Sequence, residues 1–69
     1  MKLEPVTSTS IKAIGYDKAT GTMHVQFGSG TYEYQGVSPE TYDALAGSES
    51  VGKHFHSVIK PQFKGVKIG

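Results

Sequence analysis

The sequence predicts a small α+β domain, in which a three-stranded antiparallel meander is followed by two short helices packed on one face of the sheet. Segments in which apolar and polar residues alternate occupy the first half of the chain, and glycine-containing turns separate them. The second half holds two segments with apolar residues at helical spacing, each preceded by a serine that can cap a helix. A chain of 69 residues has room for one hydrophobic core, so we predict a single domain over residues 1–69.

The three strands differ in how regular their alternation is. Residues 11–16 have the composition of a strand, but Ile14 and Tyr16 share one face while Ile11 falls on the other, an irregularity that either Gly15 or a bulge would allow. Residues 22–27 alternate strictly and are followed by a Gly-Ser-Gly turn. Residues 31–35 resume the alternation, which places Tyr32 and Tyr34 on the same face. Short turns between these segments predict two hairpins.

The first helix is predicted to begin after Ser38, a capping residue, with Pro39 at the first helical position. Gly47 is expected to end it after about two turns. The residues predicted to face the core are Tyr42, Leu45 and Ala46.

The second helix is predicted to begin after Ser48 or Ser50 and to end at Pro61. Its apolar residues recur at helical spacing and form a stripe that is expected to pack on the sheet. The residues of this stripe are Val51, Phe55, Val58 and Ile59.

The two ends of the chain carry weaker signals. Residues 1–9 are polar and have no clear period, so we predict a loosely held leader. Residues 62–69 alternate weakly through Val66 and Ile68. This tail is expected either to add an edge strand or to stay flexible, and the pattern does not choose between the two.

Charge is unevenly distributed along the chain. The net charge of +1 argues against a strongly electrostatic nucleic-acid binder. Residues 1–49 nevertheless hold three lysines against six acidic residues, whereas residues 50–69 hold four lysines and no acidic residue. The sequence has no arginine, so contacts with phosphate would come from lysine alone and base-specific readout of DNA is not expected.

No feature of the sequence indicates catalysis or a cofactor. The serines have no histidine at motif spacing, and the glycines lack the strand-to-helix context of a phosphate loop. His54 and His56 are two residues apart on a predicted helix, too far around it to converge on one ion, and His24 is expected to be exposed. We therefore predict a protein that is not an enzyme and that binds neither a metal nor a cofactor.

Composition also bears on the compartment. The chain has no cysteine, which favours a reducing environment. It also lacks a signal-peptide pattern and any apolar run near the ~20 residues that span a bilayer. We predict a cytoplasmic protein that does not associate with membranes.

Five segments share their order and spacing with a known family. They are Val6-Thr7-Ser8-Thr9-Ser10-Ile11, Ile14-Gly15-Tyr16-Asp17, Gly30-Thr31-Tyr32-Glu33-Tyr34, Val37-Ser38-Pro39, and Ser50-Val51-Gly52-Lys53-His54-Phe55 with Ile59-Lys60. These segments resemble the KTSC domain, which occurs alone in bacterial and phage proteins and at the C-terminus of some lysyl-tRNA synthetases. The sequence departs from that family at Ser38, where proline is usual, and at His56, which often is a short amide. The resemblance implies a KTSC-like domain and, through the synthetases, an association with RNA.

The leading hypothesis is a non-catalytic binding module that contacts RNA, such as tRNA, or another polyanion through the basic C-terminal third. The candidate contacts are Lys53, Lys60, Lys64, Lys67, Tyr32 and Tyr34. The tyrosines can stack on unpaired bases if their shared face is open, but we favour the interpretation that they fill the core. The alternative function is a protein-interaction module of phage or mobile-element type that binds a host protein. Self-association is also compatible with so small a core.

Overall fold

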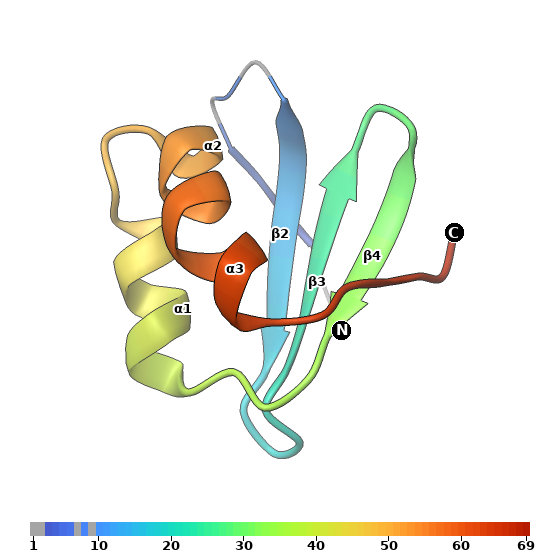
Figure 1. Ribbon diagram of the computed structural model, residues 1–69, viewed down its shortest axis with the longest axis vertical. Coiled ribbons are helices and arrows are strands. Elements are labelled where there is room, and N and C mark those ends of the chain that lie inside the picture. The colour runs from blue at the N-terminus through green and yellow to red at the C-terminus, as the bar shows by residue number, and fades with distance from the viewer. Residues whose placement is uncertain (1–2, 7, 9) are drawn as a thin grey trace.

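The computed structural model describes residues 3–6, 8 and 10–69 (Figure 1). Its strands are β1 (Glu4–Pro5), β2 (Ile11–Asp17), β3 (Thr22–Phe27), β4 (Gly30–Tyr34) and β5 (Val66–Lys67). Its helical segments are α1 (Pro39–Ala46), α2 (Val51–His54), the π-helical η1 (Phe55–Ile59) and α3 (Lys60–Gln62). The strands form one antiparallel sheet in the order β1-β2-β3-β4-β5, and the helices lie on one side of it. Within the described residues, no helix has the length and apolar character needed to cross a membrane.

The α+β prediction is confirmed, but the sheet has five strands where three were predicted. The sequence placed no strand before residue 10, whereas Glu4 and Pro5 pair with Ile14 and Ala13 of β2. Pro5 has no backbone N–H to donate, which is compatible with its position on an edge strand. Of the two alternatives for the tail, the structure has the edge strand, because β5 pairs with β4.

Of the two alternatives for the irregular first strand of the meander, Gly15 or a bulge, the structure has a bulge in β2. The register between β2 and β3 shifts between Ile11 and Ala13. This shift brings Ile11 and Ile14 into the same buried cluster despite their odd spacing. The following hairpin turn ends at Gly21, whose φ of 70° is a left-handed conformation that favours glycine.

Helix α1 begins and ends as predicted. Ser38 accepts a hydrogen bond from the backbone N–H of Thr41, and Gly47 is the C-terminal cap. Leu45 is buried and Tyr42 is half-buried, but Ala46 is exposed, so the prediction that Ala46 faces the core is wrong. The buried stripe is centred on Leu45, and the next residue lies about 100° further around the helix.

Segments α2, η1 and α3 form one continuous helical stretch over residues 51–62. Ser50 caps it by accepting from the N–H of Lys53 at 3.4 Å. The prediction that Pro61 ends this helix is wrong, because Pro61 lies within the last turn. The preceding π turn, in which the N–H of Lys60 donates to the carbonyl of Phe55, widens the helix just before the proline and eases the usual clash of its ring.

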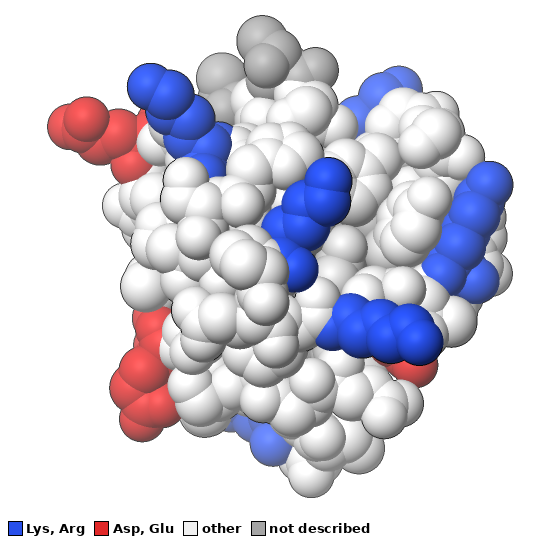
Figure 2. All heavy atoms as spheres, in the orientation of Figure 1, with Lys and Arg blue, Asp and Glu red and all other residues white. Residues whose placement is uncertain are grey.

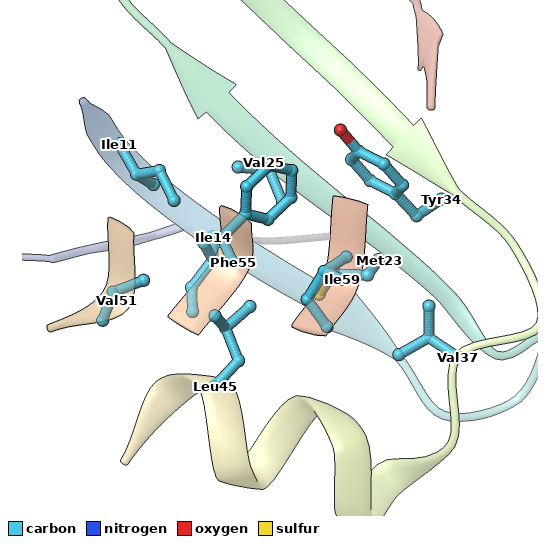
Figure 3. Close-up of a cluster of buried hydrophobic side chains, with 10 residues drawn as sticks. All are labelled: Ile11, Ile14, Met23, Val25, Tyr34, Val37, Leu45, Val51, Phe55 and Ile59. Atoms are coloured by element: carbon cyan, nitrogen blue, oxygen red, sulfur yellow. The ribbon is translucent and has the colours of Figure 1, made fainter. Parts of the chain in front are cut away.

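The core lies between the sheet and the helices, as Figure 3 shows. Every residue of the predicted second stripe belongs to it or packs against it, with Val58 half-buried. The buried cluster consists of Ile11, Ile14, Met23, Val25, Tyr34, Val37, Leu45, Val51, Phe55 and Ile59.

Candidate functional site

Two adjoining hollows lie beside the stretch α2–η1. The first, here called the aromatic hollow, has a volume of about 450 Å³, and its walls include Phe27, Tyr32, Phe55, His56 and Lys60. The second, the serine hollow, has a volume of about 580 Å³. Its walls include Ser8, Ser10, Ser50, Lys53, His56 and Ser57. Ser10 and His56 line both hollows, so the two are adjacent.

The aromatic hollow is built by the ends of β3 and β4. Tyr32 pairs with Val25, and Phe27 pairs with Gly30, so the rings of Tyr32 and Phe27 share the face that carries the helices. The Phe27 ring meets Tyr32 edge-on at 5.6 Å between centroids and meets Phe55 at 5.3 Å. Phe55 is buried, whereas Phe27 and Tyr32 are half-buried. Phe27 and Tyr32 therefore present apolar ring surface to the hollow.

Tyr34 is a core residue and not an open stacking platform. It is 6% exposed, and its ring packs edge-on against Phe55 at 5.4 Å. The tail covers it, because a Cβ on Gly65 would come within 2.7 Å of the tyrosine ring. Burial raises the pKa of its phenol, with a smaller contribution from Tyr32. Of the two tyrosines named as candidate RNA contacts, Tyr34 is buried and Tyr32 is half-buried.

The serine hollow depends on a close approach of α2 to the segment that precedes β2. Gly52 is buried, and a Cβ at this position would lie 2.8 Å from the Oγ atoms of both Ser8 and Ser10. Ser8 is held in place because its Oγ accepts from the N–H groups of Ser10 and Ile11, each at 3.3 Å. Glycine at position 52 thus lets two serine hydroxyls pack directly on the helix.

Lysine side chains stand at both ends of the paired hollows. Lys53 lines the serine hollow and Lys60 lines the aromatic hollow, and both are exposed. They are seven residues apart on the helix, which corresponds to roughly 10 Å. Both were named from the sequence as candidate contacts, and their role in binding RNA stays a prediction.

The other two predicted lysines differ from each other. Lys67 pairs with Tyr32 in the β4–β5 ladder, so it lies on the face of the aromatic hollow, and its Cε is 2.8 Å from where a Cβ on Gly30 would be. Lys64 is exposed in the connection to β5 and lines neither hollow. Figure 2 shows lysine side chains spread over this face, with the visible acidic side chains mainly at its margins.

Among the described residues, one side-chain nitrogen of a lysine or histidine lies within 4.0 Å of a carboxylate: His24 Nε2 is 3.1 Å from Glu33 Oε2. His24 and Glu33 are opposite each other on β3 and β4. Because His24 lies between the buried residues Met23 and Val25, the pair is on the face of the sheet away from the helices. His24 is half-buried beside this carboxylate, so the prediction that it is exposed is wrong. Across residues 3–6, 8 and 10–69, no lysine of the basic segment lies within 4.0 Å of a carboxylate.

Sequence reasoning missed the part that Phe27, Ser10 and His56 play in these hollows. Phe27 was noted only as part of the alternating segment 22–27, and no binding role was predicted for the serines or for His56. Only Gly52 signals the site, because a glycine inside a helix requires a reason such as close packing. That reason becomes visible only when the serine-rich segment is placed against the helix.

Solved structures include a fold that is very similar to this one. The crystal structure of a KTSC domain protein from Yersinia pestis superposes with a TM-score of 0.94, covering 99% of this chain and 97% of that one at 38% identity. A protein of Tsukamurella paurometabola is 39% identical over 67 residues, which are 96% of this chain and all of the relative. Both relatives thus match this domain from end to end.

Part of a larger protein is similar as well. A lysine–tRNA ligase of Nostoc punctiforme is 40% identical over 55 residues, which are 78% of this chain but 10% of the ligase. The family profile of the KTSC domain matches residues 7–63. Because this match covers most of the sequence, and the fold agrees with that of the Yersinia protein, the chain belongs to the KTSC domain family.

Proposed function

We propose that this protein is a non-catalytic module that binds RNA through the lysines of its C-terminal third. The observation that carries the proposal is the position of three lysines that have no carboxylate partner: Lys53 lines the serine hollow, Lys60 lines the aromatic hollow, and Lys67 lines neither but pairs with Tyr32 on the same face of the sheet. Each can offer its ammonium group to a phosphate without first leaving a carboxylate partner. Lys64 adds positive charge nearby but lies outside both hollows.

The number of lysines sets the expected dependence on salt. Contacts between three lysines and the phosphates of a single strand predict a slope of log affinity against log salt near −2. The affinity should then fall roughly 20-fold between about 50 and 200 mM salt. A net charge of +1 gives little long-range attraction, so we expect a modest affinity at physiological salt.

The relatives lend separate support. The ligase from Nostoc punctiforme carries a similar segment, and its name describes a protein that acts on tRNA. This is an argument from association and is weaker than the arrangement of lysines. The proposal places the protein in the cytoplasm, where RNA is available.

Fluorescence anisotropy with labelled tRNA and a mixed single-stranded RNA tests the proposal. The double variant Lys53→Glu/Lys60→Glu should abolish binding, and the single variant Lys60→Glu should weaken it. Lys18→Glu is the matched control, because it makes the same change of charge in the β2–β3 turn, remote from both hollows. Equal affinities for Lys60→Glu and Lys18→Glu, with unchanged circular dichroism, would refute the assignment.

A second candidate function is a protein-interaction module that recruits an extended segment to strand β5. The large hydrophobic side chains that the described residues expose are Val66, at 55%, and Ile68, at 49%. Both belong to the outermost strand or its continuation, where an added strand could pair. Loss of a partner on Val66→Ser/Ile68→Ser, together with unchanged RNA binding, would favour this function.

A further inference from the structure

The two hollows have walls of different chemistry and meet at a shared boundary. The aromatic hollow offers ring surface from Phe27 and Tyr32. The serine hollow offers hydroxyl groups and the ammonium group of Lys53. Ser10 and His56 stand between them. A ligand that fills both would be flat and apolar at one end and anionic, with several hydrogen-bond acceptors, at the other.

The aromatic hollow suits a single heterocyclic ring. Its volume of about 450 Å³ is enough for one base, and its half-buried rings give that base a surface on which to stack. Tyr34 and Phe55 also line this hollow, and their rings pack against each other in the core. Lys60 at the rim can face either a ring or a phosphate.

The serine hollow suits a phosphate. Hydroxyl groups of Ser10 and Ser57 can donate hydrogen bonds, and Lys53 supplies positive charge. One carboxylate, that of Glu49, also lines this hollow and opposes an anion there. Glu49 is exposed, so water screens its effect, and its removal should strengthen the binding of an anion.

The ligand is expected to be unpaired. In a duplex, neighbouring base pairs cover the faces of each base, so a ring cannot enter a hollow between a helix and a hairpin turn. An end, a loop or a single strand can place one base there while its phosphate remains beside it. Binding of this kind tolerates many sequences, because every base has a face that can stack.

We infer that the two hollows form one site for a single unpaired nucleotide, with its base against Phe27 and Tyr32 and its phosphate beside Ser10, Lys53 and His56. The inference rests on the proposed function, since it names the unit of RNA that the same face recognises. A free nucleoside monophosphate has the same chemistry as a nucleotide within a strand. Experiments must therefore distinguish a free nucleotide from a nucleotide within an RNA strand as the ligand.

Chemical-shift mapping on the ¹⁵N-labelled protein tests the geometry. Adenosine 5′-monophosphate should shift amides around both hollows, adenosine those of the aromatic hollow, and inorganic phosphate those of the serine hollow. Octa-adenylate should shift the same amides as the monophosphate at lower concentration, and an RNA duplex should leave the aromatic hollow unchanged. Shifts confined to residues outside both hollows would overturn the inference.

Substitution of Tyr32 tests the role of stacking. Tyr32→Leu should lower the affinity for octa-adenylate at least about 5-fold without changing the salt slope, and Tyr32→Phe should restore it. Tyr42→Leu is the matched control, because Tyr42 stacks on Tyr16 outside the hollows. If Tyr32→Leu binds as tightly as the parent while the salt slope persists, the nucleotide site is wrong and the RNA function stands.

Substitution of Glu49 tests the phosphate end. Glu49→Gln should raise the affinity for octa-adenylate more than Glu40→Gln does, because Glu40 is on α1, outside both hollows. Equal effects of the two substitutions would overturn the placement of the phosphate. If the monophosphate shifts both hollows but no RNA binds even at low salt, the nucleotide site is upheld and the RNA function fails.

Discussion

Replacement of Phe55 tests the packing on which both hollows depend. Phe55 is 2% exposed and projects from η1 onto the sheet (Figure 3). Its ring makes edge-on contacts with Phe27 and Tyr34 at centroid distances of 5.3 and 5.4 Å. Removing it takes away a buried side chain, two aromatic contacts and part of the wall of the aromatic hollow.

The expected magnitude follows from the size of the cavity and of the domain. Truncation of a buried phenylalanine to alanine costs about 3 to 5 kcal/mol, including the cavity left behind. A domain of this length has a free energy of unfolding of roughly 3 to 10 kcal/mol. Phe55→Ala should therefore remove a large part of the free energy of unfolding. Phe55→Leu keeps most of the side-chain volume and should lower that free energy by about 1 kcal/mol. That smaller loss corresponds to a fall in melting temperature of roughly 4 to 8 °C.

Urea and thermal unfolding followed by circular dichroism measure both variants against the parent. Val66→Ala is the control, because this residue is 55% exposed and a change there should stay within about 0.5 kcal/mol. If Phe55→Ala lowered the melting temperature by only a degree or so, the helix would not pack on the sheet through this ring. Both hollows would then be misplaced.

Three further outcomes are expected. Gly65→Ala should destabilise the domain by about 1 to 3 kcal/mol in urea unfolding, because its Cβ would press on the ring of Tyr34; an unchanged midpoint would contradict the packing of the tail. Ser50→Ala should cost about 1 kcal/mol of thermal stability through loss of the helix cap, and Ser50→Asp should keep it. Burial raises the pKa values of Tyr16, Tyr34 and Tyr42, so the folded state holds these protons more tightly than the unfolded state. The stability that these three phenols contribute should then be fully present below about pH 10 and be lost as the pH rises through the folded pKa values; absorbance titration with unfolding at several pH values would contradict this if stability rose above pH 10.

The central meander and the helix starts could be predicted because their signals are local. Each of these signals depends on residues that are close together in the sequence. They are the strict alternation in β3, the serine caps and the apolar stripe of the second helix. The edge strands could not be predicted in this way. Each has two residues, and they are strands only because β2 and β4 offer open edges.

The extension of the helix past Pro61 escaped prediction for a related reason. A proline inside a helical pattern normally ends it, since the ring clashes with the carbonyl four residues earlier. Here a π turn precedes the proline, and its first and last residues, Phe55 and Ile59, are both buried in the core.

Only part of the candidate site could be predicted from the sequence, because the site joins segments that are distant along the chain. The basic charge of residues 50–69 identified Lys53 and Lys60, but charge alone says nothing about where a base could lie. Their neighbours in the hollows come from the segment before β2 and from the β3–β4 hairpin.

Strand β5 connects the tail with the proposed RNA site and also with the alternative function. Its pairing brings Lys67 next to Tyr32 on the face of the hollows, while Val66 lies opposite Glu33 on the other face. A protein partner that added a strand to this edge would therefore leave the hollows open. RNA and a protein could then bind at the same time. Competition between them would indicate a shared surface on the helical face. Simultaneous binding would assign the two functions to separate sides of β5.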